Sequence, residues 1–371
     1  MPALTIAIDA SRTTTARRTG TENYALQLIR ALIALDSPHH FHLYFRDQPP
    51  DDLFPAQPNV TLHVIPWPRA WTHTRFAAAL WRARPDVTFV PAHTLPLVFP
   101  GRGVVTVHDL GYLYFPSAHP PRARRYLEWT TRFSARRAAR VLVDSLATAR
   151  DLAAHYDIPD HRITLVYPGL DDTLARVTDP ATLAGMRARY GLPERYLLFL
   201  GTLQPRKNIA RIVQAYAQWR TQSGVTDIAL VLGGSPGWLY DPAWTQGVDG
   251  VIETGYVRDE DVAALYSGAL ALVFPTLYEG FGFPVLEAMR CGVPVIASNT
   301  SSLPEVAGNA ALLVNPRGTD AIQAAIAQIV TDSTLRHTLV ARGVKQAQRF
   351  TWQNAAAAAL HALEQAAGTS P

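Results

Sequence analysis

The sequence predicts an α/β protein built from two doubly wound parallel-sheet domains, and two observations support this prediction. Short apolar runs that suit buried strands alternate with helix-like segments along the chain, which is the order of a parallel sheet covered by helices. The chain has 371 residues, of which 48% are hydrophobic, so it is long and apolar enough for two cores. We place the first domain at 1–185, the second at 186–350 and a final helical segment at 351–371.

The first domain begins with a predicted strand at Leu4–Asp9 and a polar loop that ends at Gly20, followed by a helix with an apolar stripe. Helices are also expected at about 74–84 and at 146–156. Runs rich in β-branched and aromatic residues indicate the other strands. These predicted strands are 41–45, 60–65, 87–90, 104–108, 140–145 and 163–167.

Two positions of the first domain lie where a ligand is expected, since ligands of doubly wound sheets bind at the carboxyl ends of the strands. His108 ends the strand 104–108, and Gly20 ends the first loop, where a missing side chain lets the main chain approach a ligand. Arg12, Arg17 and Arg18 in the same loop could contact a phosphate. The residues alone leave a structural histidine and a loop with solvated arginines open as alternatives.

The segment 121–140 is predicted to form a helix with a strongly basic character. Tyr126, Trp129 and Phe133 recur at helical spacing, which predicts an apolar packing stripe beneath a solvated basic face. The alternative is a docking surface for anionic lipid or for a pyrophosphate-linked acceptor. Nucleic acid is not an expected partner, because no recognised nucleic-acid motif accompanies the charge. The arginines of the segment are Arg122, Arg124, Arg125, Arg132, Arg136, Arg137 and Arg140.

The second domain restarts the pattern with a strand at 196–200 and a loop that begins at Gly201. Arg206 and Lys207 then precede a helix for which Asn208 is a favourable N-cap residue. Two cations beside the free N–H groups of a helix N-terminus predict an anion-binding loop at the carboxyl end of a strand. Solvation of both side chains is the alternative that the residues leave open.

A strand, a glycine-rich loop, a helix and a second strand are predicted within 270–299. Glu279 lies in the loop, together with Gly280 and Gly282, and Glu287 is placed in the first turn of the helix. The helix N-terminus between the two carboxylates favours a phosphate, whereas the carboxylates suit sugar hydroxyls. The segment therefore suggests a site for a phosphorylated sugar, with a solvated glutamate and an ordinary helix start as the alternative.

The remaining patterns add elements and no metal site. Further strands are predicted at 228–233 and 251–257, and a last helix at about 352–366. The triplet Asp259-Glu260-Asp261 fits the D-x-D pattern of a metal–nucleotide site. We interpret it instead as the acidic first turn of a helix, where negative side chains favour the helix dipole.

The composition favours a protein of a reducing compartment. The single cysteine, Cys291, excludes a disulfide framework, and the net charge is +4. The first residues lack the basic and apolar regions of a signal peptide, and no apolar run is long enough for a membrane-spanning helix. A cytoplasmic protein is therefore expected, with 121–140 as the segment for peripheral contact with the inner face of a membrane.

The run EGFGFPVLEAMRCGVPVIAS, at residues 279–298, closely resembles the E-x7-E signature of retaining glycosyltransferase family 4. The run GTLQPRKNI at 201–209 and the VHDL context of His108 resemble other segments of this family, and the likeness covers essentially the whole chain. The resemblance implies the GT-B fold, in which two Rossmann-like domains face a cleft. It also implies that the terminal helix, within 351–371, returns to the first domain.

For individual residues, the resemblance implies roles in binding and transferring a sugar. Arg206 and Lys207 would bind the donor diphosphate and stabilise its departing charge, and Glu279 would fix the sugar hydroxyls. His108 would lie beside the reacting sugar, with His93 a weaker candidate on the acceptor side. The other implied donor contacts are Glu287 at the ribose, backbone at Tyr256 and Val257 at the nucleobase, and Gly20, Gly201, Gly280, Phe281, Gly282 and Phe283.

The implied activity is transfer of a hexose from a nucleotide-diphosphate sugar to a saccharide or lipid-linked acceptor in polysaccharide or glycoconjugate synthesis, retaining and metal-independent. The segments IAIDA, TVHDLGYLYFPSAHP and TLQPRKNI look most like the mannosyltransferase-like branch, so GDP-mannose is the preferred donor and a UDP-sugar stays open. No tightly bound cofactor is expected. A GT-B-fold epimerase or phosphorylase and a non-catalytic nucleotide-sugar-binding module are the competing functions. An oxidoreductase is disfavoured, because no G-x-G-x-x-G follows the first strand.

Overall fold

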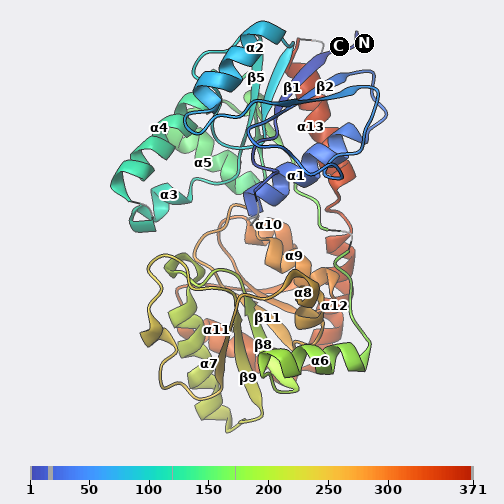
Figure 1. Cartoon of the computed structure of the whole chain (residues 1–371). Coiled ribbons are helices and arrows are strands. Elements are labelled where there is room, and N and C mark those ends of the chain that lie inside the picture. The colour runs from blue at the N-terminus through green and yellow to red at the C-terminus, as the bar shows by residue number, and fades with distance from the viewer. Residues whose placement is uncertain (1, 16–19, 119, 172, 369–371) are drawn as a thin grey trace. The chain divides into compact units, whose positions relative to one another are not determined.

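The computed structural model describes residues 2–15, 20–118, 120–171 and 173–368 (Figure 1). The chain divides into two compact units: unit 1 contains Met1–Gly169 and Phe350–Pro371, and unit 2 contains Leu170–Arg349. The sequence analysis placed the first border after residue 185, so the segment between 170 and 185 lies in unit 2 and not in the first domain. The last helix, by contrast, belongs to unit 1.

Unit 1 is built on a seven-stranded sheet in the order β3-β2-β1-β4-β5-β6-β7, and all of its strand pairs are parallel. The order reverses between β1 and β4, which is the topology of a doubly wound Rossmann-like sheet. The strands are β1 Thr5–Asp9, β2 His40–Phe45, β3 Val60–Val64, β4 Val87–Val90, β5 Arg102–Val107, β6 Arg140–Val143 and β7 Ile163–Leu165.

Two buried clusters cover the two faces of this sheet, because successive side chains of a strand point to opposite sides. Ile6 and Ile8 of β1 lie in the cluster formed with α1 and α13, whereas Ala7 lies in the cluster on the other face. Figure 1 shows α1 and α13 beside each other in unit 1. The helices are α1 Gly20–Ile33, η1 Thr72–Phe76, α2 Ala77–Ala83, α3 Gly111–Tyr114, η2 Pro116–Ala118, α4 Pro121–Arg137, α5 Leu146–Tyr156, η3 Asp160–Arg162 and α13 Trp352–Ala366.

Unit 2 repeats the architecture with a six-stranded parallel sheet in the order β10-β9-β8-β11-β12-β13, reversing between β8 and β11. Its strands are β8 Arg195–Leu200, β9 Ile228–Gly233, β10 Val251–Gly255, β11 Ala271–Phe274, β12 Val295–Ser298 and β13 Ala311–Val314. Its helices are α6 Pro180–Tyr190, η4 Pro205–Lys207, α7 Ile209–Ser223, η5 Pro242–Trp244, α8 Asp259–Ser267, α9 Phe283–Arg290, α10 Leu303–Ala307, α11 Thr319–Thr331 and α12 Ser333–Ala347. The predicted α/β class with two doubly wound parallel sheets is confirmed.

The aromatic stripe predicted for α4 is wrong for two of its three members. Tyr126 is 54% and Trp129 is 51% exposed. The buried face of α4 consists of small residues instead, Thr130, Thr131, Ser134 and Ala135, which let the helix lie close to β5. Spacing identifies a face of a helix, but which face is buried depends on what the neighbouring strand can accommodate.

Helix α6 lies in the segment that the sequence analysis treated as a domain border. It begins at an Asp179 carboxylate that accepts a hydrogen bond from the backbone N–H of Thr182, and it ends at Gly191, whose φ is +64°. Met186 is the one buried residue of the helix, so the sequence carries almost no apolar periodicity there. The residues that could have predicted this helix from the sequence are its caps, Asp179 and Gly191, because its apolar pattern is too weak.

Gly234, which follows β9, lies against the backbone of Gly201, which follows β8, so a side chain at this position can test how tightly these two loops pack. Its φ is +129°, and a Cβ at this position would lie 2.2 Å from the carbonyl oxygen of Gly201. We expect Gly234→Ala to lower the free energy of unfolding by at least about 2 kcal/mol in urea denaturation, since backbone strain and a main-chain clash act together. Gly247→Ala is the control, because its φ is +74° but nothing lies within 4 Å of the new methyl group. Equal losses in the two variants would contradict the packing described.

Candidate functional site

The candidate site of unit 2 is organised around a buried carboxylate between two cations. Glu279, in the loop after β11, is 7% exposed. Its Oε1 lies 2.7 Å from the Nζ of Lys207, and its Oε2 lies 3.1 Å from an Nη of Arg206. Both cations belong to η4, after β8, and β8 and β11 are adjacent at the point where the strand order reverses. The two loops that the sequence analysis selected therefore meet at the carboxyl edge of one sheet.

The two cations keep Glu279 ionised. Burial by itself raises the pKa of this carboxyl, but the charges of Lys207 and Arg206 and the hydrogen bond from Lys207 hold the pKa below its ordinary value. A carboxylate with a depressed pKa is a hydrogen-bond acceptor throughout the neutral range. One negative and two positive charges also leave the cluster net positive, which suits an anionic ligand.

Asn208 ties this cluster to the loops around it. Its side-chain amide donates to the carbonyl oxygens of Pro275 at 2.9 Å and Pro316 at 2.7 Å. The residue precedes α7, as predicted, but its side chain makes no capping hydrogen bond, and its φ of +64° is left-handed. The predicted capping role of Asn208 is therefore wrong. Its side-chain amide is used to bridge the loops after β11 and β13, so it makes no hydrogen bond to the N–H groups of α7.

Two serines that the sequence analysis did not select hold the Glu279 loop in place. The hydroxyl oxygen of Ser301 accepts a hydrogen bond from the backbone N–H of Glu279 at 3.0 Å. The hydroxyl of the buried Ser302 is within 3.0 Å of the carbonyl oxygen of Glu279 and 2.6 Å of that of Phe281. A run of small hydroxyl residues directly after a strand end was the signal that could have identified them.

Gly282 explains the glycine pattern of the same loop. Its φ is +113°, and a Cβ there would lie 2.4 Å from a methyl group of Leu303. The loop therefore requires glycine at this position for its backbone conformation and for close packing against α10. Gly280 and the buried Phe281 precede it, and Phe283 begins α9.

Glu287 has different surroundings from Glu279. It lies beyond the first turn of α9, because that helix starts at Phe283 and its first turn contains no acidic residue, so the predicted first-turn placement is wrong. Its Oε2 accepts a hydrogen bond from the hydroxyl of Tyr266 at 2.8 Å. Burial raises the pKa of Glu287, and this hydrogen bond offsets only part of the rise.

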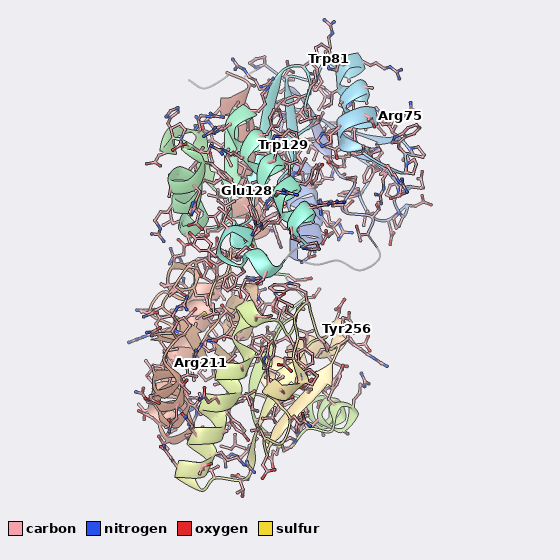
Figure 2. The ribbon with its side chains drawn as sticks, turned by 90° about the vertical axis from the view of Figure 1, so that its left-hand side faces the viewer. Arg75, Trp81, Glu128, Trp129, Arg211 and Tyr256 are labelled. Carbon is pink, nitrogen blue, oxygen red and sulfur yellow. The ribbon has the colours of Figure 1, made fainter. Side chains whose placement is uncertain are left out.

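The remaining residues predicted to contact the donor are divided between the loops of unit 2 and the first loop of unit 1. Gly201 follows β8 with a φ of +148°, and its N–H donates to the carbonyl oxygen of Gly233. Tyr256, labelled in Figure 2, is 67% exposed, and the adjacent Val257 is buried. Gly20 begins α1 of unit 1, and nothing lies within 4 Å of where its Cβ would be. Arg17 and Arg18 lie outside the described residues, and the described Arg12 is ion-paired with Glu22.

His108 of unit 1 belongs to a second polar cluster, at the carboxyl ends of β5 and β6. Its Nδ1 is 2.7 Å from the Oδ2 of Asp144, and its Nε2 is buried. The ring of Tyr24 packs edge-on against it at 4.7 Å. The Nε2 of His93 accepts a hydrogen bond from the backbone N–H of His108. Asp144 was not predicted as a site residue, although a carboxylate that directly follows the strand beside β5 was the available signal.

The protonation of the two histidines differs. For His108, burial lowers the pKa, but the charge and hydrogen bond of Asp144 outweigh it, so the pKa is raised above its ordinary value. Burial and the neighbouring His108 lower the pKa of His93 to about 3, so His93 is neutral and its Nε2 can accept. The charge of Asp109 and a backbone hydrogen bond to Pro91 also raise the pKa of His108, so the protonated imidazole is favoured and its ring is held in place by Asp144.

The described residues contain no group of three or more His, Cys, Asp or Glu side chains arranged to hold a metal ion. The acidic triplet at 259–261 forms the first turn of α8, as predicted, and Asp261 is hydrogen-bonded to Arg189 and Tyr190. None of the described helices combines the length and hydropathy of a membrane span.

Comparison with known proteins gives two family matches that together cover most of the chain. Residues 18–174 match the family described as "Glycosyltransferase Family 4", and residues 187–346 match "Glycosyl transferases group 1". The chain is 37% identical over 270 residues to the O-antigen chain mannosyltransferase B of Escherichia coli, covering 71% of this chain and 70% of that protein.

Two solved structures show the same fold. Sucrose-phosphate synthase from Thermosynechococcus elongatus superimposes with a TM-score of 0.74 at 24% identity, over 99% of this chain and 100% of that one. The Anabaena protein HepE in complex with UDP-glucose gives a TM-score of 0.70 at 16% identity, over 99% of each chain. The expected GT-B fold is confirmed by these neighbours.

The contact between Asp144 and His108 predicts a pH dependence. Because the folded pKa of His108 is raised, its contribution to stability is complete below the ordinary value of 6.5 and is lost as pH rises through the folded pKa. We expect Asp144→Asn to bring the pKa of His108 below 6.5, because burial lowers this pKa and the largest opposing effect, the charge of Asp144, is then removed.

NMR titration of the imidazole measures this shift. Asp109→Asn is the control and should change the pKa less; an unshifted His108 in Asp144→Asn would refute the assignment.

Proposed function

The chain belongs to glycosyltransferase family 4, and from this premise we propose that it transfers mannose from GDP-mannose to a saccharide acceptor in polysaccharide synthesis, with retention of configuration and without a metal ion. That it is a glycosyltransferase using a nucleotide-sugar donor follows from the family. The observation that supports the proposal most directly is the cluster of Glu279 with Arg206 and Lys207 at the switch point of the unit 2 sheet.

In this proposal the donor joins the cluster without dispersing it. Arg206 and Lys207 direct their remaining N–H donors to the diphosphate and stay beside Glu279, so that the carboxylate remains ionised. Glu279 then accepts hydrogen bonds from the hydroxyls of the sugar. The main chain from Gly280 to Phe283 lines the same place, and Gly282 keeps it free of a side chain.

The two cations also stabilise the departing diphosphate. As the bond between the anomeric carbon and the phosphate oxygen breaks, negative charge grows on that oxygen, and Arg206 and Lys207 neutralise it without a metal. The acceptor oxygen forms the new bond on the same face, and its proton passes to the released phosphate oxygen, so that no separate carboxylate base is needed. Full activity after chelator treatment and an anomeric product with unchanged configuration by NMR are the corresponding expectations.

His108 supplies a positioning group in unit 1. Asp144 fixes one ring nitrogen, and the role of the imidazole in orienting a hydroxyl of the sugar or acceptor stays a prediction from the family resemblance. The remaining donor contacts, at Glu287 for the ribose and at Tyr256 and Val257 for the nucleobase, stay predictions from the family resemblance.

Mannose is preferred over other sugars because the E. coli relative is a mannosyltransferase. A UDP-sugar is the second candidate donor, favoured by the fold neighbour that holds UDP-glucose. Thermal-shift measurements with GDP-mannose and UDP-glucose separate them, since only a bound donor raises the melting temperature. Product formed from donor in the absence of acceptor would indicate the epimerase, which is the less favoured alternative.

Peripheral contact with an anionic membrane through α4 is a further part of the proposal. Tyr126 and Trp129 are exposed on this helix, and Figure 2 shows Trp129 at the surface of unit 1. Arg122 and Arg125, one turn apart, are exposed on the same helix. Exposed aromatic rings beside arginines suit the boundary between headgroups and acyl chains.

The Glu279 cluster yields a prediction for catalysis. We expect Glu279→Gln and Lys207→Ala each to reduce the rate of transfer at least roughly 100-fold, the scale of one lost transition-state contact. Release of GDP from GDP-mannose in the presence of acceptor measures the rate. Lys345→Ala is the matched control, because Lys345 is the other lysine of the chain and lies exposed on α12. Near-normal rates in both site variants, with Lys345→Ala also unchanged, would refute the assignment.

The exposed face of α4 yields a prediction for membrane binding. We expect Trp129→Ser combined with Arg122→Gln and Arg125→Gln to abolish flotation with phosphatidylglycerol vesicles at low salt, because apolar insertion and headgroup attraction are both removed. Trp81→Ser is the control, since Trp81 of α2 is also about half exposed in unit 1, at 48%. Failure of the unmodified protein to float would remove the membrane contact from the proposal and leave transfer untouched.

A further inference from the structure

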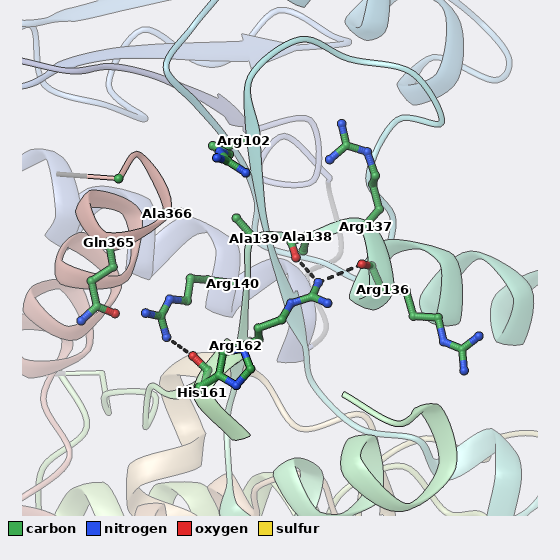
Figure 3. Close-up of a pocket in the computed structure, with 11 residues that line it drawn as sticks. Arg102, Arg136, Arg137, Ala138, Ala139, Arg140, His161, Arg162, Gln365 and Ala366 are labelled. Carbon is green, nitrogen blue, oxygen red and sulfur yellow. Dashed lines mark hydrogen bonds between the residues drawn. The ribbon is translucent and has the colours of Figure 1, made fainter. Parts of the chain in front are cut away.

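Unit 1 contains a pocket of about 510 Å³ that has no role in the function proposed above. It is lined by five arginines, Arg102, Arg136, Arg137, Arg140 and Arg162, and by parts of 138–139 and of the α13 end (Figure 3). Its volume lies within the range of small-molecule sites, roughly 300–1,000 Å³. His108 follows β5, whereas Arg102 begins it, so the length of the strand, roughly 20 Å, lies between the two.

The arginines converge because of the strand order. Arg102 is the first residue of β5, Arg140 is the first residue of β6, and Arg162 directly precedes β7. These three strands are neighbours in a parallel sheet, so their starts lie at one edge. Strands of a sheet are about 4.8 Å apart, which brings the three side chains within reach of one ligand. Arg136 and Arg137, at the end of α4, add two more from the side.

Three of the five arginines have a structural role: Arg136 donates to the carbonyl oxygen of Tyr156 and to Asp157, which end α5. Arg140 donates to the carbonyl oxygen of His161, and Arg162 donates to the carbonyl oxygens of Ala135, Arg136 and Ala138, which end α4 (Figure 3). Each guanidinium has five N–H donors, so these bonds leave donors for a ligand. Figure 3 shows the two guanidinium groups pointing to opposite sides, that of Arg140 toward the side of Gln365 and that of Arg162 toward the end of α4.

Arg102 and Arg137 have no carboxylate within 4.0 Å among the described residues, whereas Arg136 is paired with Asp157 at 3.0 Å. Arg137 lies over the ring of Phe99 at 4.7 Å, and no hydrogen bond or ion pair is recorded for the side chain of Arg102 in the described structure. A cation over an aromatic ring keeps its charge.

A count of charges decides what the pocket can accept. The carbonyl ends of α4 and α13 each contribute about half a negative charge, together roughly −1. Asp157 contributes another negative charge, against five guanidinium groups. The pocket therefore carries roughly three uncompensated positive charges. One phosphate group supplies only about −1.5 to −2, whereas two linked phosphates supply enough to match.

We propose that this pocket is a second anion site, which binds a small soluble ligand carrying two linked phosphate groups. The several planar guanidinium forks suit phosphate oxygens, which they can bind in pairs, and the open pocket admits a ligand from solvent. The ligand lies at the opposite edge of the unit 1 sheet from His108, so it does not take part in the transfer step. The inference is independent of which sugar donor the protein uses.

The test is a calorimetric titration with inorganic pyrophosphate. Lys207→Ala serves as the background, because pyrophosphate is also expected to bind the cations of unit 2. We expect saturable binding in this background that weakens as salt rises, and at least about 10-fold weaker binding when Arg102→Gln and Arg137→Gln are added, the loss of two charge-assisted contacts. Arg82→Gln, at an exposed position of α2, is the matched control and should leave the affinity unchanged.

Three results would overturn the proposal: no binding in the Lys207→Ala background, equal affinity after the Arg102 and Arg137 changes, or loss of vesicle flotation in those variants without any pyrophosphate binding. If the double variant is not folded by circular dichroism, Arg102→Gln alone replaces it, since the Arg102 side chain is exposed. Transfer activity is not a readout here, so failure of this site and failure of the proposed activity are distinguishable.

Discussion

The ion cluster of Glu279, Arg206 and Lys207 is the interaction on which the candidate site depends. Removing a carboxylate from water costs several kcal/mol, and this cost is offset only where charges of opposite sign are close and well oriented. Here two cations share one carboxylate. Unlike an ordinary ion pair, which is neutral, the cluster therefore keeps one net positive charge. The remaining positive charge is available to a diphosphate while Glu279 stays compensated.

Hydrogen bonds between the surrounding loops hold the three charged side chains of the cluster in place. Asn208 links the loops after β11 and β13, and Ser301 and Ser302 hold both the N–H and the carbonyl of Glu279. Such supporting hydrogen bonds fix the geometry of the charged groups, which is the requirement for electrostatic stabilisation of a transition state. The same loop has no room for a side chain at Gly282, so backbone is all that it can offer a ligand there.

Unit 1 uses its sheet at both edges. At the carboxyl edge, adjacent strands bring Asp144 to His108, which raises the pKa of the imidazole and orients its ring. At the opposite edge, the starts of β5, β6 and β7 bring arginines together around a pocket. The parallel arrangement is the common cause, because it collects equivalent positions of successive strands at one edge of the sheet. The exposed aromatic face of α4 is separate from both, and follows from the small residues on its buried face.

The sequence by itself determined the α/β class, the two parallel sheets, the family and the two loops that meet at the Glu279 cluster. These follow from contiguous patterns: the alternation of strands and helices, and a signature whose residues lie within one strand–loop–helix unit. The division of the chain near residue 170 and the helix α6 were not foreseen, because a helix that buries only Met186 has almost no apolar periodicity.

The tertiary structure alone decided which side chains meet. Glu279 lies 72 residues from Lys207, and Asp144 lies 36 from His108, so neither contact is encoded in a local pattern. Both follow from strand order, which places β8 next to β11 and β5 next to β6. For the same reason Asn208 bridges two loops and does not cap its helix, and Tyr126 and Trp129 remain at the surface. Local sequence fixes what a segment becomes, and the arrangement of segments in space fixes what each side chain can touch.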